Sequence, residues 1–500
     1  MMMGEQQCSQ VSSILATQGS VTPRATPVRA LRVASRLAQF GSMILMAQTL
    51  LPGIAAAQSN GETLQGALAA SYASNPALQA ARAQLRSVDE GVPTALAGWR
   101  PTVIVSASGG PAIGTQTVRT SGFDNTTKQG RALANTSATI TQPIYTGGKT
   151  VAGTNKATNL VYSARAKLIA AEETLFGNIV QAYVGVIQAQ DILQLDINNE
   201  QVLTRQLQAT NDRFRVGEIT RTDVAQAEAA LAGAAATRET AEGSLQVARA
   251  TYQQLVGDLP GTLVDPQPLK LPTRSLEEAK ALASDNNPSV VAAEFQNASD
   301  KDNFDLQYSA LMPNVNLQAS GGYTQNASQA GVRTHEGQIL ASLSVPIYQG
   351  GAEYSAIRQA RQTEQQSRKL IDDAKRTAVQ QVISAWETYA AAKSTIDSTR
   401  SQIRSNQIAL EGTQREAIVG SRTTLDVLNA EQLLLNSRTT LVQNLAALVT
   451  ASYQVASAVG RLTARDLALQ VPFYDETAYF QAVRNRLVGT GDYATGQPGR

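Results

Sequence analysis

The chain has 500 residues, a formal net charge of +2 and an aromatic content of only 5%. The balanced charge gives no indication of nucleic acid or another strongly charged partner. The scarcity of large aromatic side chains argues against several ordinary globular cores and favours long helices that pack through small residues. With one cysteine, Cys8, and one histidine, His335, the chain cannot build a Cys/His metal cluster or an intrachain disulfide. We therefore expect no metal and no cofactor.

The first 57 residues have the composition of an export signal. Four arginines between Arg24 and Arg36 form a basic region, residues 43–51 carry most of an apolar stretch, and the alanines at 55–57 offer an A-x-A cleavage site. We interpret residues 1–57 as a signal peptide, with a buried helix as the alternative. Because residues 58–500 contain no run of 18 apolar residues, we expect any membrane span to consist of strands in a closed barrel.

The remainder of the chain contains two copies of one unit. The segment Gln142-Pro143-Ile144-Tyr145-Thr146-Gly147-Gly148 returns 203 residues later as Val345-Pro346-Ile347-Tyr348-Gln349-Gly350-Gly351. The same offset relates Val216-Gly217 to Val419-Gly420 and Asp223-Val224 to Asp426-Val427. Upstream, Asn75-Pro76 and Pro101 return at an offset of 212 as Asn287-Pro288 and Pro313. The segment between Pro101 and Pro143 is therefore nine residues longer than its counterpart. Such a duplication predicts a tube with internal pseudo-symmetry rather than an enzyme with a pocket.

The duplication divides the exported chain into a first repeat at 58–258, a proline-rich linker at 259–274, a second repeat at 275–462 and a tail at 463–500. After a helix at 62–98 that is interrupted near Asn75, the first repeat is expected to contain strands at about 101–113 and 134–145, separated by a glycine-rich loop at 109–131. Its helices are expected at about 148–215 and 221–257. In the second repeat we expect strands at about 313–325 and 337–348 and helices at about 351–418 and 423–460. The glycines near the C-terminus predict a partly disordered end of the tail.

The predicted strands alternate apolar and small polar residues. In the second repeat, Val315, Leu317 and Ala319 alternate with asparagine, glutamine and serine. Strands of this pattern suit a transmembrane barrel with a wet lumen, and a soluble, half-buried hairpin is the alternative. The strand-end tyrosines Tyr145 and Tyr348 suit an interfacial girdle.

The predicted long helices have no proline and would each extend about 100 Å at 1.5 Å per residue. In the second of them we expect a buried stripe of Val379, Ile383, Trp386 and Ala390. Each long helix is expected to stop at the Val-Gly pair, since glycine tolerates the left-handed backbone of a helix end. The shorter helices carry heptads with small residues in one row, such as Ala227, Ala234 and Ala241, which allow an antiparallel neighbour to approach closely.

One chain supplies four candidate membrane strands, fewer than the eight of the smallest single-chain bacterial barrels. Open edges in lipid would leave backbone groups unpaired at a cost of several kcal/mol each. If the strands span a membrane, several chains must therefore share one barrel. The long helices begin where the strands end, so they would continue the barrel as a conduit on one side.

The export signal, the duplicated Pro-Ile-Tyr-x-Gly-Gly junctions and the duplicated Val-Gly…Asp-Val turns closely resemble the TolC family of outer-membrane channel proteins over about residues 60–462. The segment Val471-Pro472-Phe473-Tyr474-Asp475 resembles the type I secretion members of that family. The resemblance implies an α+β membrane channel. Its duplicated β-β-α-α units would form a shared trimeric 12-stranded β-barrel and a long α-helical, coiled-coil periplasmic barrel.

The same resemblance implies a homotrimer in the outer-membrane lipid of a Gram-negative bacterium, with the helical tube projecting into the periplasm. It implies docking to a periplasmic adaptor (membrane fusion) protein and to an inner-membrane ABC or RND transporter, and no nucleic-acid partner. The expected function is export of proteins, small molecules or both from a type I secretion or multidrug efflux complex.

The resemblance also assigns a gate at two helix–turn–helix tips, residues 213–226 and 415–429. Thr222 and Asp223 match the family's threonine–aspartate pair, and Arg422 matches the arginine that closes on it. Asp426 matches one of two constricting aspartates, whereas Asn429 occupies the other position and Ala417 replaces the family's tip tyrosine. These departures predict a looser, less charged constriction. Helix capping is the alternative role for these residues, and we expect Thr222 and Thr424 to act as caps in either case.

Two further sets of residues follow from the resemblance. Adaptor docking is expected at the tip turns, Val216, Gly217, Val419 and Gly420. The strand-to-helix junctions are expected at Pro143, Tyr145, Gly147, Gly148, Pro346, Tyr348, Gly350 and Gly351.

Two other classes of function were weighed against a channel. An enzyme is disfavoured because the sequence has no nucleophile–base pair and no Gly-x-x-x-x-Gly-Lys loop. A soluble periplasmic coiled-coil adaptor or scaffold protein is the main alternative, which would explain the helices but not the duplicated alternating strands.

Overall fold

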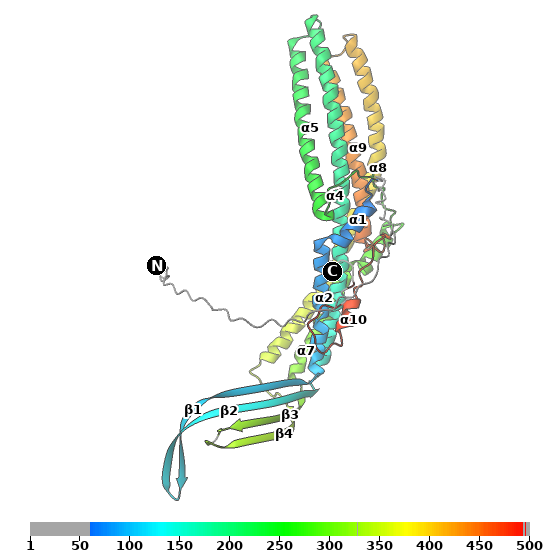
Figure 1. Cartoon of the computed structure of the whole chain (residues 1–500). Helices are drawn as coiled ribbons and strands as arrows, with labels where there is room; N and C mark the ends of the chain where they lie inside the picture. The colour runs from blue at the N-terminus through cyan, green and yellow to red at the C-terminus, as the bar shows by residue number, and fades with distance from the viewer. Residues whose placement is uncertain (1–60, 328, 494–495, 497–500) are drawn as a thin grey trace, which may run out of the picture. The chain divides into compact units, whose positions relative to one another are not determined.

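The computed structural model describes residues 61–327, 329–493 and 496, so the predicted signal peptide lies outside the described residues, as does most of the final segment that we expected to be disordered. The first repeat begins with the short helices α1 (Leu64–Ser74), α2 (Pro76–Asp89) and α3 (Gly91–Leu96) and the 3-10 turn η1 (Ala97–Trp99). Strands β1 (Thr102–Thr120) and β2 (Phe123–Tyr145) follow, and then helices α4 (Lys149–Arg215) and α5 (Arg221–Val256) (Figure 1).

The second repeat has the same order of elements. Helices α6 (Leu276–Asn286) and α7 (Pro288–Tyr308) and the 3-10 turn η2 (Ser309–Leu311) precede strands β3 (Asn314–Gln325) and β4 (Arg333–Ser344). Helices α8 (Ala352–Ile418) and α9 (Thr424–Ala458) complete the repeat, and α10 (Ala478–Val483) lies in the tail. The fold is therefore α+β, and its two longest helices have 67 residues each, or about 100 Å.

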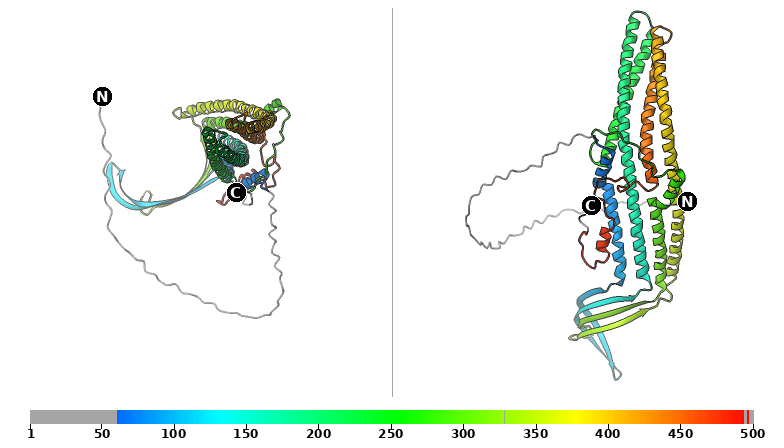
Figure 2. Two further views of the ribbon diagram at one scale, coloured as in Figure 1. Left: turned by 90° about the horizontal axis from the view of Figure 1, so that it is seen from above. Right: turned by 90° about the vertical axis from the view of Figure 1, so that its right-hand side faces the viewer.

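The four strands form one antiparallel sheet in the order β1-β2-β3-β4. Figure 2 shows the sheet curved in an arc when it is seen along the helices. The glycine-rich loop predicted at 109–131 is wrong, because β1 and β2 stay paired up to Thr120 and Phe123 around a tight turn at Ser121 and Gly122. These two residues have φ angles of 53° and 89°, as a two-residue hairpin turn requires.

The predicted end of the last strand at about 348 is also too late. β4 ends at Ser344, two residues before Pro346, which has no N–H to donate to a ladder. The extra length of the first copy thus lies in the β1–β2 hairpin, which continues past the end of β3 and β4.

Each long helix packs against the helix that follows it, α4 against α5 and α8 against α9, and α7 lies between α4 and α8. The small residues Ala227, Ala234 and Ala241 of α5 are buried as expected. The stripe predicted for α8 is wrong at Ile383 and Ala390, which are exposed, whereas Val379 and Trp386 are partly buried and Trp386 packs against the core. The buried face of α8 instead carries Ala378, Val382 and Ala385, because small side chains let α6, α7 and α9 approach closely.

Two equivalent asparagines each fasten the end of a helical hairpin within their own repeat. Asn75 caps α2 by accepting the N–H of Ala77 at 2.9 Å, and its side-chain amide donates to the carbonyl of Leu255 near the end of α5 at 2.9 Å. Asn287 caps α7 in the same way and donates to the carbonyl of Ala458 at the end of α9 at 3.1 Å. Each Asn-Pro pair therefore breaks a helix and holds the end of a long hairpin.

The tail closes over the buried side of this middle region. The guanidinium of Arg82 is fully buried, lies 4.5 Å from the ring centre of Tyr72 and 5.1 Å from that of Tyr474, and donates to the carbonyl of Tyr72. On α4, Glu172 accepts the N–H of Ala464 at 2.6 Å and Glu173 accepts the N–H of Leu462 at 3.2 Å. One buried and one partly buried carboxyl group thus hold the segment that follows α9.

Burial raises the pKa of Glu173 to about 8, against the opposing effect of the hydrogen bond from Leu462. A raised carboxyl pKa means that the folded protein holds a proton that the unfolded chain releases above about 4.5. We expect stability to fall as the pH rises from about 5 to 8, by at most about 1.4 kcal/mol per pH unit for this proton. In Glu173→Gln, whose amide oxygen still accepts the Leu462 N–H, this part of the slope should vanish in thermal melts recorded against pH. An unchanged slope would contradict the assignment.

Candidate functional site

The two helix–turn–helix tips have the same backbone path. Helix α4 is followed by Val216 and Gly217, and α8 is followed by Val419 and Gly420. Both glycines hold a φ of 81°, the left-handed conformation expected of a helix stop. The next residue donates back into the finished helix in each case, Glu218 to the carbonyl of Arg213 and Ser421 to that of Glu416, both at 3.0 Å. These bonds satisfy carbonyls that a helix end would otherwise leave free.

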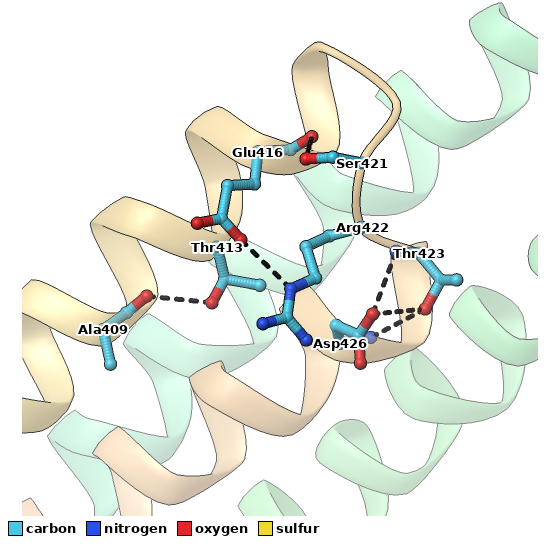
Figure 3. Close-up of polar contacts among 7 residues, drawn as sticks. All are labelled: Ala409, Thr413, Glu416, Ser421, Arg422, Thr423 and Asp426. Atoms are coloured by element: carbon cyan, nitrogen blue, oxygen red, sulfur yellow. Dashed lines mark hydrogen bonds and ion pairs between the residues drawn. The ribbon is translucent and has the colours of Figure 1, made fainter.

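A capping box starts the second helix of each tip. Thr220 accepts the N–H of Asp223, whose carboxylate accepts the N–H of Thr220 at 2.9 Å and its hydroxyl at 2.7 Å. Thr423 and Asp426 repeat this arrangement at 3.0 and 2.9 Å (Figure 3). The expectation that Thr222 and Thr424 act as the caps is therefore wrong, because each lies inside its helix. The Thr-x-x-Asp spacing at 220–223 and 423–426 was the signal for the true caps.

An ion pair braces each tip, and its polarity is reversed between the copies. In the first tip the guanidinium of Arg213 lies 3.0 Å from the carboxylate of Glu218. In the second tip Glu416, which is the counterpart of Arg213, pairs with Arg422 at 3.0 Å (Figure 3). Both pairs are exposed, so each contributes at most about 1 kcal/mol. Sequence analysis missed Glu416 because it considered Arg422 only as a partner of the other tip.

One subunit does not bring Thr222, Asp223 and Arg422 into contact. Within the described residues Asp223 is bonded to Thr220, and Arg422 is bonded to Glu416. Both groups remain partly or fully exposed, so their surfaces stay accessible to a neighbouring chain. A contact between the first tip and Arg422 therefore stays a prediction for the assembled tube.

The predicted constriction residues lie on the first turns of α9. The backbone N–H and the hydroxyl of Thr423 hold the pKa of Asp426 below its usual range, and Arg422 adds to the effect. Hydrogen bonds from the Thr220 hydroxyl and backbone lower the pKa of Asp223 in the same way. Both carboxylates are therefore charged at neutral pH. Asn429 is exposed one turn further along, while Ala417 is buried against Leu410, Val427 and Leu434.

The turns themselves carry exposed apolar side chains. Val216 is 71% exposed, and in the second tip Ile418 and Val419 are 79% and 78% exposed. Isolated exposed apolar residues are ordinary, but their repetition at both tips gives each turn an apolar end beside the capping box.

The strand-to-helix junctions position the helices relative to the sheet. Gly147 and Gly148 hold φ angles of 65° and 88°, and Gly350 and Gly351 repeat them at 72° and 87°. A side chain at Gly147 would meet Met312 at 2.6 Å, so this position needs glycine for space as well as for its backbone. The register of β2 against β3 shifts between Pro143 and Tyr145. Pro346 follows the last strand, and Tyr348 is 76% exposed.

No group of three or more His, Cys, Asp or Glu side chains that could hold a metal ion occurs among the described residues. None of the helices in the described ranges is both long enough and apolar enough to pass through a membrane.

The capping boxes give a direct prediction for the tips. Thr423→Ala removes the oxygen that accepts the N–H of Asp426, so we expect a loss of about 1 kcal/mol of local stability and faster amide exchange in the first turn of α9. Thr423→Ser keeps a hydroxyl and should behave like the wild type. Equal exchange in both variants, measured residue by residue with mass spectrometry, would contradict the capping role.

Comparison with known proteins agrees with this architecture. The model of the family described as "Outer membrane efflux protein" matches residues 67–258 and 281–461. The outer membrane efflux protein BepC of Brucella suis is 33% identical over 453 residues, which cover 89% of this chain and 95% of that protein. The outer membrane protein TolC of Escherichia coli is 27% identical over 312 residues, covering 59% and 63% of the two chains.

Solved structures show the same fold at lower identity. The outer membrane protein VceC of Vibrio cholerae superimposes with a TM-score of 0.69 at 19% identity, covering 79% of this chain and 96% of that one. A membrane protein of Pseudomonas aeruginosa gives a TM-score of 0.70 at 17% identity, with 79% and 90% covered. Both repeats fall within the matched family, and the relatives are transport channels rather than enzymes. The chain belongs to the outer membrane efflux protein family, and it is an outer-membrane export channel whose long helices lie on the periplasmic side.

Proposed function

We propose that three copies of this chain form one channel-tunnel that exports cargo from a periplasm-spanning complex. The observation that carries the proposal is the open sheet, in which β1 and β4 are edge strands that pair, among residues 61–327 and 329–493, only with β2 and β3. In lipid these edges must be paired, and pairing β4 of one copy with β1 of the next closes a ring. Three copies of four strands give the 12 strands of the family barrel named above.

The helices extend the same symmetry into the periplasm. Each subunit contributes the pairs α4–α5 and α8–α9, so a trimer has twelve long helices around one axis. The exposed groove on α8 that is lined by Val379, Ile383 and the stems of Lys375 and Arg376 suits contact with a neighbouring subunit. A soluble coiled-coil adaptor is disfavoured because it leaves the sheet unexplained.

The partners follow from the tips and from the relatives. Val216, Gly217, Val419 and Gly420, with the exposed Ile418, would dock a periplasmic adaptor that connects the tube to an inner-membrane ABC or RND transporter. AprF of Pseudomonas aeruginosa is an alkaline protease secretion protein, and FusA of Burkholderia cepacia is a fusaric acid resistance protein. Proteins, small molecules or both are therefore the proposed cargo.

The assembly can be tested on the purified mature chain in neutral detergent. We expect a mass of three subunits that survives high salt and separates only on heating. A monomer that stays in solution without detergent would contradict both the barrel and the tunnel. Deletion of the gene, scored for secreted proteins and for drug sensitivity in parallel, would assign the cargo class.

The gate gives a separate electrical prediction. If three Asp426 carboxylates surround the axis, they attract cations and repel each other. Asp426→Asn removes the charge and keeps an oxygen that can still accept the Thr423 N–H, so cation selectivity in single-channel recordings should fall while the fold is kept. Asp397→Asn, at an exposed position in the middle of α8, is the matched control. Equal selectivity in the two variants would exclude Asp426 from the constriction.

A further inference from the structure

The middle of helix α4 has two different faces. One face carries Phe176, Ile179 and Tyr183, which are fully buried in the core beneath α1 and the tail. The opposite face carries Asn178 and Gln181, whose side chains are exposed. In the trimer proposed above, α1 and the tail belong on the outer wall of the tube, since three copies of them inside it would obstruct the lumen. The face with Asn178 and Gln181 therefore points inward.

This inward face of α4 is the floor of a groove that follows the helix. The section nearer the tips has a volume of about 680 Å³ and lies between α4, α5 and α9. The section nearer the sheet has a volume of about 440 Å³ and is walled by α8, α9 and the start of α7. Asn178 and Gln181 line both sections, so the two form one groove, called the inner groove below. Its floor runs from Ala170 to Gln188, which is about 27 Å at 1.5 Å per residue.

The inner groove is rich in side-chain amides that are not used for folding. Five of them make no hydrogen bond with any other described residue: Asn178, Gln181, Gln188, Gln254 and Gln443. Each such amide has an acceptor oxygen and two donor hydrogens. The groove therefore offers donors and acceptors together, from three helices, to whatever passes along it.

Charged side chains avoid this part of the helices. Residues 174–190 of α4 and 439–458 of α9 contain no Asp, Glu, Lys or Arg, although 16% of the chain is charged. The one ionisable group among the described residues that line the groove is Glu173, which is buried and accepts the N–H of Leu462 at 3.2 Å. Burial raises the pKa of Glu173 to about 8, so this carboxyl group is mostly protonated at neutral pH. The groove thus neither attracts nor repels a ligand through charge.

The size and chemistry of the inner groove favour one kind of occupant. Drug-sized ligands prefer pockets lined by apolar and aromatic side chains, and no aromatic side chain is among the described residues that line this groove. An extended polypeptide presents N–H and C=O groups in alternation, and side-chain amides can pair with both whatever the sequence. At about 3.3 Å per residue, the floor of the groove matches about eight extended residues.

We propose that the inner groove holds the main chain of unfolded polypeptide during export, so that protein is the cargo class of this channel. Uncharged contacts of this kind keep a passing chain against the wall without selecting its sequence or trapping its charged side chains. The inference rests on the trimer proposed above, because only the assembled tube turns this face of α4 into the wall of a lumen.

The test records single channels of the full mature protein in planar bilayers. The probe is a peptide of about ten alternating glycine and serine residues with blocked ends, long enough to span the groove and added on the barrel side. We expect current blockades whose duration falls about tenfold in Gln181→Met/Gln443→Met, because each lost hydrogen bond weakens binding a few-fold. Methionine keeps the length of the glutamine side chain and stays uncharged, so the conductance of the empty channel should not change.

The control variant is Gln470→Met/Gln481→Met, which changes two exposed glutamines of the tail on the outer wall. It should hold the peptide as long as the wild type does, and equal blockade durations in the two variants would overturn the site. A neutral linear oligosaccharide of similar length is the second probe. If the oligosaccharide is held as long as the peptide and loses the same factor in Gln181→Met/Gln443→Met, the assignment to polypeptide is wrong. Absence of any channel would refute the trimer, whereas channels with unaltered peptide blockades would refute this inference alone.

Discussion

The need to pair every backbone group in lipid governs this molecule. In the described part of the chain the sheet has four strands, and a single chain leaves both of its edges open there. A soluble protein could blunt such edges with charge or cover them, but the outward residues beside them are valine, isoleucine and leucine. In the proposed trimer, identical neighbours supply the matching edges all the way round. The duplicated sequence is consistent with this constraint, because two similar hairpins per chain divide the ring into nearly equal parts.

Hydrogen bonds in the region between the sheet and the helix tips hold the ends of the helices in place. Asn75 and Asn287 each break a helix and bind the end of the long hairpin of their own repeat, so each repeat is held together at the same place. The Tyr183 hydroxyl adds a third tie, 2.7 Å from the carbonyls of Glu62 and Val264, and it joins the start of the described chain to the inter-repeat segment. Because these ties use buried polar groups with full hydrogen bonding, loosening any of them would leave an unpaired group at a cost of about 1–3 kcal/mol.

Much of this architecture could be predicted from the sequence, since it follows from periodicity and repetition. The proline-free runs predicted long helices, and the Val-Gly pairs predicted their ends, because glycine at positive φ is a local requirement. Errors occurred where tertiary packing decides. The buried stripe of α8 was predicted at Ile383, whereas Val382 is the buried residue. The helix carries apolar side chains on two faces, and the sequence does not tell which face packs within the subunit and which is left for a neighbouring one. The glycines and threonines at 109–131 were interpreted as a loop. Such residues are also compatible with strands when one face of the sheet contacts water.

The tips show why the gate residues were the hardest to assign. Family resemblance directed attention to contacts between tips, whereas the strongest local interactions lie within each tip. Arg422 is already bonded to Glu416, and Asp223 to Thr220, before any neighbour arrives. A bond between Arg422 and the first tip must therefore replace the existing Arg422–Glu416 ion pair, which is of similar strength. The net free energy gained by such a contact would be only the difference between the two ion-pair energies. The reversed polarity of the two ion pairs has a further effect, since it places Arg213 and Glu416 at equivalent points of the two tips. In the trimer proposed above, these two positions would present opposite charges in alternation around the axis, and pairs as weak as these could be exchanged when a partner docks.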